Sequence, residues 1–278
     1  MNMLDLHPVF FIVGLMVSAL GIAMFIPMIV DLIYNDNSWR AFGISGILTA
    51  LFGASLALAT YTPNPNMRAR EAFLLTVLSW VSLSIFSAVP FIMEPLKLSI
   101  TDALFEATSG ITTTGATTIV GLDNLPKSIL LYRQLLQWIG GMGLIVLAVA
   151  VMPALGIGGG QLYKMELPGS HGNQKLTPKI TDSAKALWKI YVGLTVACAT
   201  LYLLSGMSLF DSIAHSLSTV AGGGFSTHDG SIGFFDSALI ETVCIIFMLL
   251  SAASFAVHYA AIFGGKPLKY FYDSEFKF

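Results

Sequence analysis

Two short segments of this chain have the residue types that an ion-selective backbone requires. A potassium-type filter is a short extended run whose carbonyl oxygens replace the water shell of the ion. Its side chains must be small, and glycine is needed where the backbone leaves the common φ/ψ regions. Neither segment carries acidic side chains, so selection by carbonyl oxygens favours a monovalent cation. The filter segments are predicted to be Thr112, Thr113, Thr114 and Gly115 in one copy and Ala221, Gly222, Gly223 and Gly224 in the other. The predicted potassium ligands are the backbone carbonyls of Thr113, Thr114, Gly222 and Gly223.

Both segments belong to a longer repeat. SITDALFEATSGITTTGATT at 99–118 is echoed 109 residues later by SLFDSIAHSLSTVAGGGFST at 208–227. Each copy opens with Ser-x-x-Asp, a helix-start pattern, so we predict short helices over about 100–111 and 209–220. The carbonyl end of a helix carries about half a negative charge, and pointed at the membrane centre it favours a cation there. A single Gly/Thr-rich loop is usually only a turn, but two aligned copies favour a pore.

Polar side chains inside the two short helices are candidates for filter support. Glu106 aligns with His215, and Ser109 aligns with Ser218. An ionisable group at membrane depth suggests a functional role. We interpret all four as hydrogen-bonding support behind the filter, with a direct role on the ion path as the alternative for Glu106 and His215. Arg133 is either an interface anchor or a partner of Glu106.

These segments need membrane-spanning helices to position them, and the composition provides for such helices. Hydrophobic residues make up 55% of the 278 residues and charged residues only 11%, well below the charged share of soluble domains. A span needs about 20 mostly apolar residues, and the two short helices are too short to cross. Re-entrant half-helices fit them better. Six spans are predicted, roughly at Val9–Ile33, Phe42–Tyr61, Ala72–Ile92, Ile129–Pro153, Leu187–Leu204 and Ser237–Phe263.

The distribution of lysine and arginine predicts an orientation. With six spans, ten Lys and Arg residues fall on one side and four on the other. Cytoplasmic loops carry the excess of positive charge, so the N-terminus is expected to be cytoplasmic. Both short helices then enter from the outer face.

The fold class is therefore an all-α membrane protein. Two N-terminal transmembrane helices precede two repeats of span, re-entrant pore helix, filter and span, and the pore is incomplete. The expected parts are an N-terminal helix pair at 1–66, a first repeat at 67–155, a cytoplasmic linker at 156–184, a second repeat at 185–265 and a cytoplasmic connector from 266 to 278.

Several function classes find no support in the residues. The sequence shows no metal-ligand spacing, nucleophile–base pair or phosphate loop, so we expect neither an enzyme nor a cofactor. The net charge of −2 and the lack of a basic run argue against nucleic acid as a partner. The lipid bilayer is the expected surrounding.

The motifs DALFEATSGITTTGATT (102–118), QWIGGMGLIVLAVAVMP (137–153) and SLSTVAGGGFSTHDGSIGFF (216–235) resemble the Trk/Ktr superfamily of potassium transporters, TrkH or TrkG type. The resemblance implies potassium uptake across the bacterial inner membrane through a pore ringed by four filter strands. It also implies a homodimer and a cytoplasmic nucleotide-binding regulatory subunit of the TrkA type.

This sequence ends after the second repeat, and we therefore expect it to supply two of the four strands. One alternative is a secondary transporter built on broken helices, which predicts inverted repeats, whereas these copies run in the same direction. The other is a non-conducting truncated scaffold.

Overall fold

The computed structural model describes residues 5–63, 69–93, 95–154 and 180–253, together with a few single residues beyond 253. The described residues form helices joined by short irregular segments, as the sequence predicts. The long helices are α1 (His7–Ala23) with α2 (Phe25–Tyr34), α3 (Trp39–Ala59), α4 (Ala69–Ile92), α6 (Lys127–Ala154), α8 (Ile180–Leu204) and α10 (Ala238–Ala252). The shorter elements are α5 (Ile100–Ile111), α9 (Leu209–Ala221) and the 3₁₀ turns η1 (Leu122–Asn124) and η2 (Ser231–Phe235).

Four stretches of helix in the described residues are long and apolar enough to cross a membrane. They are His7–Tyr34, Trp39–Ala59, Arg70–Ile92 and Ala186–Leu204, and they match four of the six predicted spans. The predicted span Ile129–Pro153 falls within α6. Of the predicted span Ser237–Phe263, the structure describes a continuous helix only over Ala238–Ala252.

The first span is two helices in succession, which the prediction did not divide. α1 ends at Ala23, Met24 lies between the helices, and α2 begins at Phe25. Pro27 follows four residues after Ala23 and has no N–H to donate to the Ala23 carbonyl, so the ladder is interrupted there. The axis continues beyond the break because Met24 keeps right-handed helical φ and ψ.

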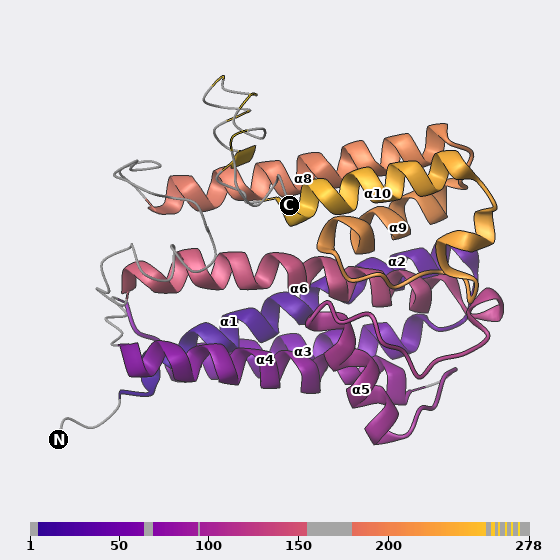
Figure 1. Cartoon of the computed structure of the whole chain (residues 1–278). Helices are drawn as coiled ribbons and strands as arrows, with labels where there is room; N and C mark the ends of the chain where they lie inside the picture. The colour runs from indigo at the N-terminus through magenta and orange to yellow at the C-terminus, as the bar shows by residue number, and fades with distance from the viewer. Residues whose placement is uncertain are drawn as a thin grey trace.

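The two short helices lie at the same end of the bundle (Figure 1). α5 has the predicted bounds, and α9 extends one residue beyond the predicted 209–220. In Figure 1 both are at the right-hand end, together with η1 and η2, whereas α4 begins at the left-hand end. The long helices α4, α6, α8 and α10 run alongside one another between these ends.

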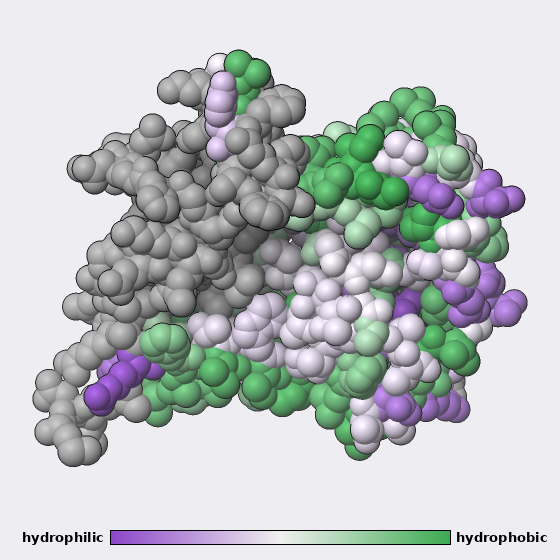
Figure 2. Space-filling view, viewed as in Figure 1, coloured by the Kyte–Doolittle hydropathy of each residue, from purple (hydrophilic) through white to green (hydrophobic). Residues whose placement is uncertain are grey.

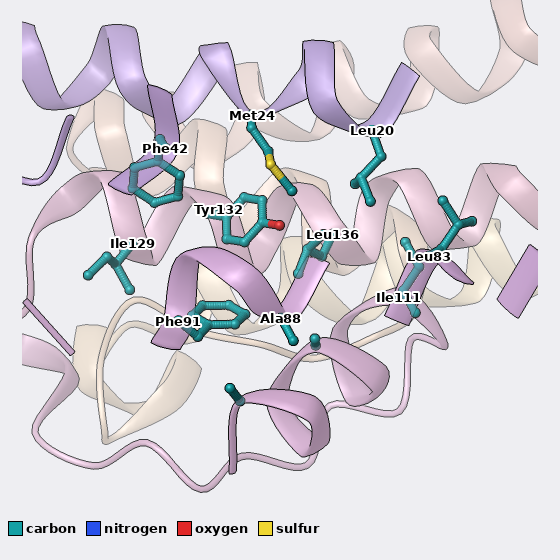
Figure 3. Close-up of a cluster of buried hydrophobic side chains, with 12 residues drawn as sticks. Leu20, Met24, Phe42, Leu83, Ala88, Phe91, Ile111, Ile129, Tyr132 and Leu136 are labelled. Carbon is teal, nitrogen blue, oxygen red and sulfur yellow. The ribbon is translucent and has the colours of Figure 1, made fainter. Parts of the chain in front are cut away.

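α5 is held by an apolar cluster shared with α1, α3, α4 and α6 (Figure 3). Tyr132 of α6 lies at its centre, with its ring centroid 5.2 Å from that of Phe42 and 5.3 Å from that of Phe91. The Tyr132 hydroxyl donates to the carbonyl of Ser87 at 3.0 Å, so its one polar atom is satisfied. Ile111, the last residue of α5, packs into the same cluster. The position of α5 relative to α6 is thereby set by close packing.

A buried carboxylate joins the N-terminal helix pair to α6. Asp31 is 1% exposed and accepts from the backbone N–H groups of Ser38 and Trp39 and from the Ser128 hydroxyl at 2.7–3.0 Å. It therefore caps α3 from the preceding helix, because the N-cap residue of α3 makes no side-chain cap of its own. The same carboxylate fixes the first turn of α6, whose later turns carry the site.

The surface separates into regions of different polarity (Figure 2). Hydrophilic residues gather at the end that carries η1 and η2, and hydrophobic residues cover much of the side of the bundle. Large apolar side chains such as Leu51, Phe73 and Leu249 are more than half exposed. Such extensive exposure of apolar side chains is typical of a surface that faces lipid.

Candidate functional site: two aligned helix-turn-strand segments

Both short helices begin with the predicted cap. The Ser99 hydroxyl accepts from the Asp102 backbone N–H at 3.1 Å and donates to its carboxylate at 2.7 Å. In the second copy the corresponding Ser208–Asp211 distances are 3.0 and 2.6 Å. The two helix starts are therefore chemically equivalent, and each has an acidic side chain in its first turn, where the helix dipole favours it.

Both helices also end in the same way, in a turn that the sequence reasoning did not foresee. Thr114 N–H donates to the Ser109 carbonyl, and Thr113 N–H donates to the Gly110 carbonyl. These 6→1 and 5→2 bonds define a Schellman motif, which places one residue in the left-handed region. That residue is Thr113, with φ +56°. Its counterpart is Gly222, with φ +68°.

The turn corrects the predicted extent of the extended segments. Thr112 and Thr113 belong to the turn that closes α5, and Ala221 is the last residue of α9. The irregular chain that follows each helix therefore starts at Thr114 and Gly223, later than expected. The serines contribute through their main chains, because the carbonyls of Ser109 and Ser218 accept the 6→1 bonds. The Ser109 hydroxyl has no partner among the described residues, and the Ser218 hydroxyl donates to the His215 carbonyl.

The glycines at the aligned positions have left-handed backbones, as the filter prediction requires. Gly115 has φ +78° and Gly224 has φ +77°. Positive φ therefore alternates along each segment, at residues 113 and 115 and at 222 and 224. Alternating handedness turns successive N–H groups to one side of the chain, which leaves their carbonyls on the other side.

The two segments approach each other at backbone contact distance. A Cβ added to Gly115 would overlap the carbonyl oxygen of Gly223. No side chain fits between the two chains there, so Gly115 is needed for its size as well as for its φ.

Glu106 supports the first segment from behind. It is fully buried, and its carboxylate accepts from the Thr117 hydroxyl at 2.9 and 3.0 Å and from the Thr118 N–H at 3.1 Å. Arg133 Nε lies 2.7 Å from Glu106 Oε1. A buried carboxylate needs this many donors to offset its lost hydration.

His215 supports the second segment at the aligned position. Its Nδ1 lies 3.0 Å from the Asp211 carbonyl and its Nε2 lies 3.0 Å from the Ser226 hydroxyl. A carbonyl only accepts, so Nδ1 carries the proton and, in the neutral ring, Nε2 accepts from Ser226. Ser226 aligns with Thr117. Both repeats thus tie the same helix position to the residue two places beyond the aligned glycine, Gly115 or Gly224.

Arg133 joins the two repeats. Its guanidinium contacts Glu106 and donates to the Thr117 hydroxyl at 3.0 Å on the first repeat. On the second repeat it donates to the Ser226 carbonyl at 3.0 Å and lies 4.3 Å from the Phe225 ring centroid. The rigid five-donor fork of arginine suits such a junction. Of the two alternatives from the sequence, the structure assigns Arg133 as the partner of Glu106.

The loops that follow the segments are joined by a second set of polar contacts. His228 Nδ1 hydrogen-bonds the Asp123 carboxylate, and its Nε2 lies 3.5 Å from Asp211 Oδ1. The Asp229 carboxylate accepts from the Gly121 N–H at 3.1 Å. The hydrogen bond from His228 lowers the pKa of Asp123 below its ordinary range.

The residues that sequence reasoning missed are Thr117, Phe225, Ser226 and Gln137. Thr117 and Ser226 could have been selected from the sequence, because both are small hydroxyl residues at the same position of the repeat. Gln137 could not, because residue 246, which lies 109 residues later, is isoleucine. Gln137 is fully buried and its Oε1 accepts from the Phe225 N–H at 3.0 Å.

Glycines in the middle of α6 let the site pack against it. A Cβ on Gly140 would overlap the carbonyl oxygen of Ile111 at the end of α5. A Cβ on Gly141 would come within 2.8 Å of the Tyr191 hydroxyl and 3.2 Å of Ala221 Cβ at the end of α9. The ends of the two short helices therefore pack against two adjacent glycines of α6, as expected of small residues at helix contacts.

Comparison with known proteins identifies relatives of this arrangement. Residues 38–276 match the TrkH family model, described as cation transport protein. The Trk system potassium uptake protein TrkH of Halomonas elongata is 47% identical over 276 residues, 99% of this chain and 57% of that protein. TrkH of Escherichia coli is 49% identical over 267 residues, 96% of this chain and 55% of that protein.

A solved structure is also similar. The crystal structure of the potassium transporter TrkH from Vibrio parahaemolyticus matches with a TM-score of 0.86 and 43% identity, over 99% of this chain and 56% of that one. The chain thus spans a little over half the length of the relatives it matches. On the family match and these identities, the chain belongs to the TrkH family of cation transport proteins.

Proposed function

We propose that this chain supplies two of the four filter strands of a protein that takes up potassium. The proposal rests on the backbone conformation that the two segments have in common. Each follows a capped short helix, each alternates positive φ at the same positions, and the two touch at Gly115 and Gly223. Relatives that carry the name potassium uptake protein support the choice of ion.

The proposed ligands are backbone carbonyls of Thr113, Thr114, Gly222 and Gly223. The turn at each helix end satisfies the carbonyls of residues 109, 110, 218 and 219 internally. The carbonyls of residues 113, 114, 222 and 223 are left for the ion, whose water shell they replace. Thr112 and Thr114 are exposed in the structure. We propose that this open side faces the pore axis and the remaining strands.

The finer topology is proposed on the same basis. The parts are the helix pair at 1–66, a repeat at 67–155, a linker at 156–184, a repeat at 185–265 and the connector from 266. α5 and α9 are re-entrant pore helices that enter from the outer face of the bacterial inner membrane, with the N-terminus cytoplasmic. Ten basic residues on one side against four on the other support this orientation.

The proposed assembly is a homodimer with a cytoplasmic nucleotide-binding regulatory subunit of the TrkA type. Both partners are what the resemblance to the Trk/Ktr transporters implies. Co-purification of the chain with a tagged second copy, and separately with a candidate regulatory subunit, tests each partner independently.

Uptake is tested in a bacterium that lacks its own potassium uptake systems. In one strain the chain is expressed alone, and in another it replaces the matching 267 residues of E. coli TrkH. We expect the chimera to restore growth at low potassium and the chain alone to give none. A chimera that reaches the membrane in normal amount without restoring growth would contradict the proposal.

A further inference from the structure

Gln137 lies where α6 passes behind both segments. Its side chain is fully buried, and its Oε1 accepts from the Phe225 N–H at 3.0 Å. Its Nε2 has no hydrogen-bond partner among the described residues and is 3.8 Å from the place a Cβ on Gly115 would take. One carboxamide from the first repeat therefore contacts the second segment and lies next to the glycine of the first.

The hydrogen bond to Phe225 fixes the direction of a neighbouring carbonyl. The Phe225 N–H and the Gly224 carbonyl belong to one planar trans peptide, so they point in opposite directions. An N–H held by Gln137 behind the segment turns the Gly224 carbonyl away from α6. That carbonyl adjoins the proposed ligands of the second segment.

The second segment has particular need of such an anchor. It contains Gly222, Gly223 and Gly224 in succession, and glycine moves between backbone conformations more readily than any other residue. The aligned residues of the first segment include two threonines, whose branched side chains restrict the backbone. A glycine-only run keeps one peptide orientation only where an outside contact holds it.

Packing strengthens the anchor. A Cβ on Gly223 would overlap the Gln137 carboxamide, so that side chain fills the space beside the segment. Arg133, one helical turn earlier on the same face of α6, holds the Ser226 carbonyl at 3.0 Å. Gln137 and Arg133 therefore hydrogen-bond Phe225 and Ser226, the two residues that follow Gly224.

We propose that Gln137 is a positioning residue that keeps the Gly224 carbonyl directed at the ion path and thereby sets the preference for potassium over sodium. The inference rests on the proposed function of the two segments. α10 offers no matching carboxamide, because Ile246 and Met248 stand 109 and 111 residues after Gln137.

The experiment compares two glutamines on one helix in the chimera described above. Gln137→Met keeps the side-chain length and removes the acceptor. Gln134→Met is the matched control, because Gln134 is also fully buried on α6 and makes no hydrogen bond within the described residues.

The readout is the ratio of potassium to sodium uptake, measured together with the amount of protein in the membrane. We expect Gln137→Met to lower the ratio by about tenfold, the equilibrium factor of one well-made hydrogen bond. Gln134→Met should keep the ratio of the parent. An unchanged ratio in Gln137→Met, or an equal loss in Gln134→Met, overturns the inference.

A folding failure does not prevent the test. If Gln137→Met does not accumulate, Gln137→Asn replaces it, because the shorter side chain stays polar but falls short of the Phe225 N–H. A parental ratio in Gln137→Asn then overturns the inference, and a lowered ratio supports it. Absence of uptake by the unmutated chimera is a separate outcome that contradicts the proposed function itself.

Discussion

Arg133 Nε lies 2.7 Å from Glu106 Oε1, with the two side chains 1% and 0% exposed. The pair joins α6 to α5, and the remaining donors of Arg133 reach Thr117 and Ser226. One ion pair therefore supports the chain that follows Gly115 and the chain that follows Gly224. Its neutralisation should affect both segments together.

Glu106→Gln leaves the guanidinium of Arg133 buried without a counter-charge. Loss of one partner of a buried pair costs about 3–5 kcal/mol. We expect a large fall in the thermal unfolding midpoint of the chain in detergent. The double variant Glu106→Gln/Arg133→Met should recover part of that loss, and a double variant less stable than Glu106→Gln alone argues against the pairing.

Two glycines of α6 should respond differently to alanine. Gly140→Ala places a methyl group on the Ile111 carbonyl, so α5 must move and stability should fall by more than about 1–3 kcal/mol, the usual cost of overpacking. The methyl group of Gly143→Ala meets no atom of the described residues within 4 Å, so this variant should be neutral or more stable by up to about 1 kcal/mol. Unfolding midpoints of the two variants, measured side by side, test the contact. Equal effects would contradict it.

Gly115 should be more sensitive to alanine than a glycine with the same φ in open space. Gly115 and Gly121 have φ +78° and +75°, so alanine strains both backbones by roughly 1–2 kcal/mol. Only at Gly115 does the new methyl group also overlap the Gly223 carbonyl oxygen. Gly115→Ala should therefore lower the unfolding midpoint of the chain further than Gly121→Ala. A smaller effect at Gly115 means that the segments are not in backbone contact.

Acid should weaken the contact between the loops that contain Asp123 and His228. The His228 hydrogen bond lowers the pKa of Asp123, so the folded chain binds fewer protons at this carboxylate than the unfolded chain. This contribution to stability is present above the ordinary value of about 3.9 and is lost as pH falls through the lowered pKa. Unfolding midpoints between pH 6 and pH 3 should fall less steeply for Asp123→Asn than for the parent. If the unfolding midpoint falls equally steeply in Asp123→Asn and in the parent, the hydrogen bond between His228 and Asp123 does not stabilise the folded chain.

The parts of the site that were predictable depend on local chemistry. The starts of α5 and α9 follow from Ser-x-x-Asp, because the cap joins residues three apart. The left-handed glycines follow from residue type, since Gly115 and Gly224 recur at one repeat position. The break at Met24 was also available from Pro27, although hydropathy alone suggested one continuous span.

The missed parts depend on tertiary contacts or on a residue that departs from its propensity. Thr113 adopts a left-handed backbone that β-branched residues rarely accept, because the helix-ending turn requires it. The partner of Arg133 was one of two alternatives until α5 and α6 were placed side by side. Gln137 has no polar counterpart at residue 246, so the repeat pattern gave no reason to select it.

The measurement that tests the central claim most directly is the potassium-to-sodium preference of the chimera with Gly115→Ser and, separately, Gly224→Ser. Each serine must occupy a left-handed position that adjoins the proposed carbonyl ligands. We expect each variant to lose about tenfold in preference, as a change of 1.4 kcal/mol in relative site energy would produce. If both variants reach the membrane and keep the preference of the parent, these segments are not the selectivity filter.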